Sequence, residues 1–132
     1  MGSVRVRTSD RFEVVDVTDE VRSWLRTIKA HNGLLTVYLP HTTAAITINE
    51  PESGLRQDVI DLVKEVFRPG GPWRHNMVDV NAHAHLAAMF MGNSRVVPVV
   101  DGDLGLGTWQ AILLVEMDGP RERTLRLIYV GD

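Results

Sequence analysis

The sequence contains no cysteine, which excludes disulfide bonds and thiolate metal sites. Its apolar runs are far shorter than a membrane span, and its first residues lack the apolar core of a signal peptide. The formal net charge of -3 provides no basic surface of the kind that binds nucleic acid. With 44% hydrophobic residues among 132, we expect one cytoplasmic domain over residues 1–132, with neither a nucleic acid nor a membrane as partner.

The pattern of apolar residues predicts about seven strands and two to three helices, without regular alternation between the two. This order favours an α+β fold with mostly antiparallel strands. Residues 3–8 and 11–17 are expected to form a first hairpin, and residues 109–117 and 124–130 a last one. Thr18 has the position and the side chain of a helix N-cap.

Two amphipathic helices are expected, one after Thr18 and one over about residues 55–66, where apolar residues recur at helical spacing. Asn81 is placed to cap a third helix that runs through Met91 and ends at Gly92. Between the last two helices, residues 68–80 form a long loop. Loops of this length often carry function.

Four of the five histidines gather between residues 41 and 85. Histidine is the commonest metal ligand and the usual acid–base at neutral pH, and two or three of them with a carboxylate would suit zinc. We take His41, His83 and His85 as candidate metal ligands. On a helix, however, His83 and His85 would point to opposite sides, so at most one would join His41. The alternative, that these are surface or hydrogen-bonded histidines, stays open.

Three polar segments allow two interpretations each. Residues 105–110 form either a turn before a core strand or the mouth of a site with Trp109 and Gln110. Glu50 either belongs to a strand end with helix capping or is a carboxylate held at a cleft. Residues 101–103, Asp-Gly-Asp, form a turn or hold a magnesium ion.

Several of these segments occur in this order in a known family. The sequence resembles the YjbQ-like family, for which secondary thiamine-phosphate synthase activity has been proposed. The resemblance extends over nearly the whole chain and is carried by residues 41–50, residues 85–94, Pro98, residues 105–110 and Glu116.

The resemblance implies a compact, sandwich-like α+β fold that assembles as a homotrimer, with sheets packed around the three-fold axis. It also implies a polar pocket near a subunit boundary, with His41, Glu50, His85 and Gln110 as the catalytic residues. One departure concerns the segment after Glu50, where the family usually has Asn-x-Asp and this chain has Pro-Glu-Ser. An acidic residue of the second helix matches Asp58 only across a one-residue gap, so no role is carried over to it.

Three functions stay open on these grounds. The first is a transferase that joins a pyrimidine pyrophosphate to a thiazole phosphate, with a divalent metal (Mg or Zn) as the cofactor. It would need cationic groups for the phosphates, for which Arg74 and Arg95 are the nearest candidates. The second is a trimer that binds a metal or a small metabolite, without this activity. The third is a structural trimer whose polar cluster only satisfies buried groups.

Overall fold

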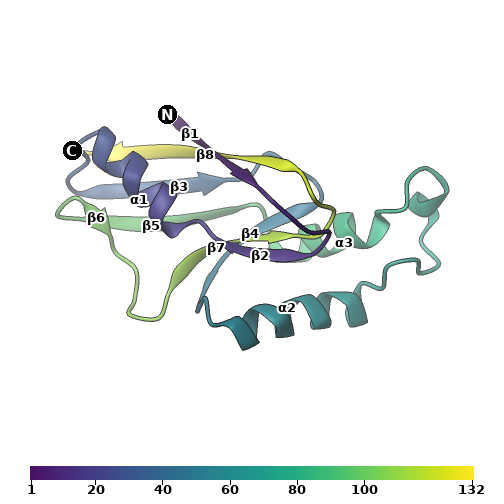
Figure 1. The fold of residues 1–132 in the computed structure, drawn as a ribbon. Helices are drawn as coiled ribbons and strands as arrows, with labels where there is room; N and C mark the ends of the chain where they lie inside the picture. The colour runs from purple at the N-terminus through teal and green to yellow at the C-terminus, as the bar shows by residue number, and fades with distance from the viewer.

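A computed structural model describes all residues from 1 to 132 and contains two antiparallel sheets and three α-helices (Figure 1). The first sheet has the order β1 (Gly2–Arg7), β8 (Glu122–Gly131), β3 (Gly33–Tyr38), β5 (Ser94–Val100) and β6 (Asp103–Leu104). The second sheet has the order β2 (Glu13–Asp16), β7 (Ala111–Glu116) and β4 (Ala44–Asn49). The helices are α1 (Thr18–Thr27), α2 (Ser53–Val66) and α3 (Ala82–Met91), with a short 3-10 helix, η1, over Arg74–Met77. The α+β prediction is confirmed, and the short β6 was not anticipated.

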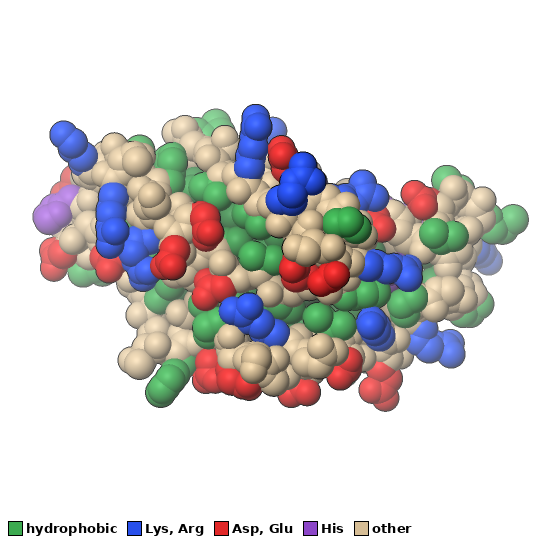
Figure 2. Space-filling model, viewed as in Figure 1, with side chains coloured by type: hydrophobic (Ala, Val, Ile, Leu, Met, Phe, Trp, Pro, Cys, Tyr) green, Lys and Arg blue, Asp and Glu red, His purple; other side chains and the backbone are tan.

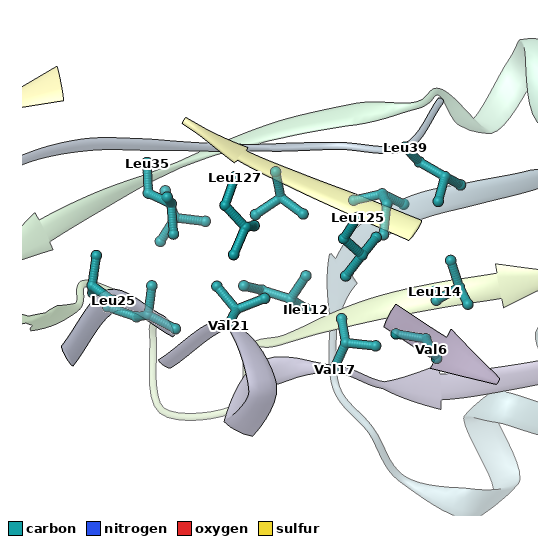
Figure 3. Packing of buried hydrophobic residues seen from close by; sticks show 14 of the residues in the cluster. Val6, Val17, Val21, Leu25, Leu35, Leu39, Ile112, Leu114, Leu125 and Leu127 are labelled. Atoms are coloured by element: carbon teal, nitrogen blue, oxygen red, sulfur yellow. The ribbon is translucent and has the colours of Figure 1, made fainter. Parts of the chain in front are cut away.

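The main hydrophobic core lies between the two sheets (Figure 3). Leu35 and Leu127 reach it from the first sheet and Ile112 from the second, and all three are fully buried. Helix α1 closes one end of this core with Val21 and Leu25, which lie one helical turn apart on the same face. The amphipathic spacing in α1 is therefore what joins the helix to both sheets.

A second, smaller core lies on the opposite face of the three-stranded sheet, which α2 and α3 cover. Helix α3 contributes Ala84 and Ala87, whose small side chains allow the helix backbone to approach the sheet closely. The outer face of α2 carries exposed acidic residues, which Figure 2 shows along the lower edge of the molecule. None of the three helices has the length and apolar character that a membrane span requires.

Both predicted hairpins are wrong. Strand β1 pairs with β8 and not with β2, and β2 pairs with β7, in the other sheet. Strands β7 and β8 also belong to different sheets, so each of the two expected hairpin turns instead carries the chain across from one sheet to the other. The two crossing segments lie side by side: the Thr8 N–H in the first donates to the Arg121 carbonyl in the second at 2.8 Å. Alternating hydrophobicity marks the buried face of a strand, but it does not identify the strand's partner.

The prediction of Thr18 as a cap is wrong as well. Thr18 is the first residue of α1, and its hydroxyl accepts a hydrogen bond from the Ile112 N–H at 2.9 Å and donates to Asp16 at 2.6 Å. A buried backbone N–H in β7 needed a partner, and this need outweighed the capping preference. The third helix does end at Gly92, whose φ of 96° suits glycine, as predicted.

Candidate functional site

His41 is positioned by the point at which β3 stops. The register pairs Tyr38 with Arg126, and the strand ends before Pro40, while β8 continues paired only with β1 on its other edge. The Thr124 N–H, left without a strand partner on this side, donates to Nε2 of His41 at 2.9 Å. Since Nε2 accepts, the neutral ring carries its proton on Nδ1. Nδ1 has no protein partner and is accessible from outside the chain, so it can donate to a ligand.

Electrostatics favour the same neutral form of His41. Burial lowers the pKa of His41, and the positive charge of Arg123 lowers this pKa further. The neutral ring is therefore the predominant form at neutral pH. In this orientation neither ring nitrogen offers a free lone pair to a metal, because one accepts a hydrogen bond and the other is protonated.

His85 reaches the same place from α3. Its ring packs edge-on against His75, with 4.6 Å between the ring centroids. His75 in turn is held by Asn81, whose Oδ1 lies 3.1 Å from its Nε2. Asn81 occupies the N-cap position of α3, but its side chain makes no cap hydrogen bond and serves this contact instead. The predicted cap residue therefore orients a histidine.

His41 and His85 line a common hollow, which we call the polar pocket, with a volume of about 340 Å³. Apart from Pro40, the side chains that line it are polar or charged, so an apolar ligand would gain little there. Its lining residues are Pro40, His41, Thr42, Thr43, Asp79, Asn81, His85, Asp118, Arg121 and Arg123.

The floor of the polar pocket contains a buried ion pair between Arg123 and Glu116. Nε of Arg123 donates to one carboxylate oxygen at 2.8 Å, and Nη2 contacts the other. Nη2 also donates to the Thr43 hydroxyl at 2.9 Å. Nη1 makes no hydrogen bond to the protein and is accessible, so it faces the polar pocket that Arg123 lines. The pair thereby presents one fixed cationic donor to a ligand.

Glu116 is held ionised by the groups around it. The Thr8 hydroxyl donates to its carboxylate at 2.8 Å, and the N–H groups of Met117 and Asp118 donate at 3.0 Å each. Burial alone raises the pKa of Glu116, but hydrogen bonds from Arg123, Asp118 and Thr8 outweigh it and keep this pKa below its ordinary value. The buried carboxylate is therefore charged and fully partnered.

Arg121 provides a second cation at the rim. Its side chain is half exposed and is fixed by Asp118, which accepts Nη2 on Oδ2 at 3.0 Å and Nε on its carbonyl at 2.8 Å. Asn81 donates to the same Oδ2 at 2.8 Å. Arg121, Arg123 and the Nδ1–H of His41 thus converge on one pocket, an arrangement suited to anions such as phosphate.

Glu50 and Gln110 do not lie at the polar pocket of the same chain. In the second sheet Ala44 pairs with Glu116 at one end, and Asn49 pairs with Ala111 at the other. Glu50 directly follows β4 and Gln110 directly precedes β7, so both lie at the end marked by Asn49 and Ala111. That end is roughly 17 Å away along the strands. Glu50 lines a separate cavity of about 150 Å³ under α2. Gln110 is exposed and accepts the Gly107 N–H at 2.8 Å, so it fixes the glycine turn.

His83 also lies apart from His41 and His85. It is fully buried on the opposite side of α3, as helical spacing predicts, with Nε2 at 3.1 Å from the Met117 carbonyl and Phe12 packed against its ring. Its Nδ1 is buried without a partner, and burial lowers its pKa. The structure therefore does not assemble His41, His83 and His85 as a zinc site, and no other group of three or more potential ligands is arranged for a metal.

The cations of the polar pocket differ from those expected. Arg95 binds the Ser94 and Met91 carbonyls, and Arg74 lines a neighbouring hollow. Arg121 and Arg123 supply the charge instead. For Arg123 the signal in the sequence was alternation, which places it on the same face of β8 as the buried Leu125 and Leu127, whereas Arg121 precedes the strand. A second signal was the single acid, Glu116, that ends an otherwise apolar strand and requires a buried partner.

Comparison with known proteins finds relatives that match nearly the whole chain. A sequence model described as "UPF0047 protein YjbQ-like" matches residues 2–132. The chain is 47% identical to a UPF0047 protein of Archaeoglobus fulgidus, over 89% of this chain and 91% of the relative. It is 37% identical to the UPF0047 protein YugU of Bacillus subtilis, over 99% of both chains.

Solved structures give the same result. A hypothetical protein from Aeropyrum pernix superposes with a TM-score of 0.97 at 58% identity, covering 99% of this chain and 98% of that one. A YbjQ-like protein of unknown function from Sulfolobus solfataricus superposes with a TM-score of 0.96 at 45% identity, covering 99% and 96%. Both the sequence and the fold thus match one group of proteins, and the chain belongs to the YjbQ-like UPF0047 family.

Proposed function

We propose that the polar pocket binds the phosphate groups of a small phosphorylated ligand, and that the protein acts there as a thiamine-phosphate synthase-like transferase. The observation that carries the proposal is the convergence of Arg121, Arg123 Nη1 and His41 Nδ1–H on a pocket that is polar apart from Pro40. Donors fixed in advance stabilise developing negative charge without further reorganisation. A departing pyrophosphate carries charge of this kind.

The reaction assigns each side chain a distinct role. The lone pair of the thiazole nitrogen forms a bond to the methylene carbon of the pyrimidine, while the carbon–oxygen bond to pyrophosphate breaks and its electron pair leaves with the pyrophosphate. Arg121 and Arg123 hold the leaving phosphates, and His41 donates a hydrogen bond from Nδ1. His85 is the candidate for transferring a proton to the leaving oxygen.

Two carboxylates make the polar pocket compatible with magnesium. Asp79 and Asp118 both line it, and each has one oxygen engaged, Asp79 by the Val80 N–H and Asp118 by Asn81 and Arg121. The remaining oxygens match the one or two carboxylates by which Mg²⁺ is usually held beside substrate phosphates. When bound, the ion would neutralise charge on the leaving group.

The test is an assay of the purified protein with both substrates and magnesium. We expect thiamine phosphate and pyrophosphate to form in equal amounts, with neither product formed when one substrate is omitted. Binding of pyrophosphate without turnover would instead support the second candidate, a protein that binds a phosphorylated metabolite, because the same donors serve binding alone. Absence of both binding and turnover would refute the proposal.

We also propose that the protein assembles as a homotrimer through the outer face of its five-stranded sheet. Leu34, Val96, Val100, Ile128 and Val130 are all more than two-fifths exposed, on the face opposite to the core. The register places Leu34 directly opposite Val130, so this apolar surface is continuous across β3 and β8. Exposed apolar patches of this kind mark interaction sites.

Placing a charge on this face should disrupt the assembly. The variant Val96→Lys is expected to shift the mass in solution from three times that of the chain to that of the chain, because a buried unpaired ammonium is costly. Light scattering after size exclusion measures this mass. The variant Leu62→Lys, on the exposed face of α2, is the matched control and should remain trimeric. A monomeric wild-type protein would contradict the proposal.

Under this proposal Glu50 and Gln110 stay predicted catalytic residues. The cytoplasmic location also stays a prediction. Within one chain both residues are separated from the polar pocket by the length of β4. A neighbouring subunit would be the source of any Glu50 or Gln110 side chain at His41 and His85.

A further inference from the structure

A second hollow adjoins the polar pocket on the other side of His85. It has a volume of about 440 Å³, within the range of small-molecule sites, and we call it the ring pocket. In contrast to the polar pocket, its lining is half hydrophobic. The lining residues are Pro72, Trp73, Arg74, His75, Ala82, His85, Leu86 and Met89.

The walls of the ring pocket are fixed before any ligand binds. Nε1 of Trp73 donates to the Arg68 carbonyl at 2.9 Å, and the Trp73 N–H donates to the Gly71 carbonyl at 2.7 Å, so the indole is held within a long loop. His75 is held by Asn81, and its ring meets His85 edge-on. Leu86 belongs to α3 and faces the loop from the helix. A preorganised aromatic wall of this kind loses little entropy when a ligand binds.

The two hollows are complementary in chemistry and share a wall. His85 lines both, and a third small hollow of about 180 Å³ joins them, since its lining includes His41 from one and Met89 from the other. One side chain therefore separates a polar pocket that contains two arginines from an aromatic and apolar one. A ligand that satisfies both needs a phosphate at one end and a flat ring at the other.

We infer that the ring pocket binds the heteroaromatic ring of the same ligand whose phosphate occupies the polar pocket, with Trp73 as the residue that selects for a ring. This inference rests on the proposed function for its anionic end. The ring lies between the indole of Trp73 and the apolar side chains of Leu86 and Met89, and the phosphate reaches past His85 to Arg121 and Arg123. The substrate class is a phosphorylated heteroaromatic compound.

The test compares two probes by calorimetry, inorganic phosphate and thiamine phosphate, of which only the second carries heteroaromatic rings, joined to the phosphate through an ethyl chain. Wild-type protein should bind thiamine phosphate about tenfold more tightly than phosphate, the contribution expected of aromatic stacking. In the Trp73→Ala variant the dissociation constant for thiamine phosphate should rise about tenfold, and that for phosphate should stay unchanged. The control variant is Phe90→Ala. Phe90 is an exposed aromatic residue of α3 that does not line the ring pocket, so its removal should change neither dissociation constant.

A second variant guards against a collapsed loop in Trp73→Ala. Leu86→Ala alters the wall from α3 and leaves the Trp73 hydrogen bond to Arg68 in place, so it should weaken thiamine phosphate binding alone. If thiamine phosphate binds and neither variant weakens it selectively, the ring pocket is overturned while the proposed function stands. If neither probe binds to wild-type protein, the anionic site fails and this inference fails with it.

Discussion

The variant His85→Ala is expected to lower the rate of thiamine phosphate formation about 100-fold or more, the usual contribution of a positioned general acid. His85 lines both the polar pocket and the ring pocket, so its ring is at the junction where the bond to pyrophosphate would break. The side chain is only partly buried and packs on the exposed His75, so its loss leaves the two cores intact. Steady-state kinetics and a thermal melt, run on the same preparation, measure both effects.

A matched control for His85 is His31→Ala, which removes an exposed histidine from the region between α1 and β3. We expect this control to retain full activity. Equal losses of activity and melting temperature in His85→Ala would identify a structural role and count against a catalytic one. Full activity in His85→Ala would remove the residue from the mechanism.

The variant Arg123→Leu is expected to destabilise the fold by about 3–5 kcal/mol, or roughly 10–20 °C in melting temperature. Removing the guanidinium leaves Glu116 charged, fully buried and without its cation. The double variant Arg123→Leu with Glu116→Leu should recover much of this loss, because it removes both charges and needs no buried counterion. Denaturant unfolding of the two single variants and the double variant gives the coupling directly.

Two further observations separate this prediction from a general loss of packing. Arg5→Leu removes an arginine whose side chain is 80% exposed and pairs with Glu122 at 3.8 Å, and it should change stability little. The contribution of Glu116 should also depend on pH. Because its pKa is lower in the folded chain than the ordinary 4.5, its contribution is complete above about pH 4.5 and is lost as the pH falls through the folded value. A double variant no more stable than Arg123→Leu would contradict the account.

The sequence determined the elements and their buried faces, because these follow from local periodicity. Val21 and Leu25 lie on one face of α1 at any tertiary arrangement, and His83 and His85 diverge on any α-helix. The end of α3 at Gly92 is equally local. The family resemblance rests on ordered motifs and likewise needed no coordinates.

Only the tertiary structure decided which strands pair and which side chains share a pocket. The turns after β1 and β7 look the same whether the chain folds back or crosses to the other sheet, so the two predicted hairpins could not be distinguished from crossings. His41 acquired its tautomer from the Thr124 N–H, 83 residues away in the chain. Arg123 lines the pocket with His41 because β8 extends past the end of β3, and Arg121 joins them from the residue before β8, whereas Glu50 and Gln110 are a strand length away. Contacts over such sequence separations depend on sheet register, and register is set by the packing of both sheets around their common core.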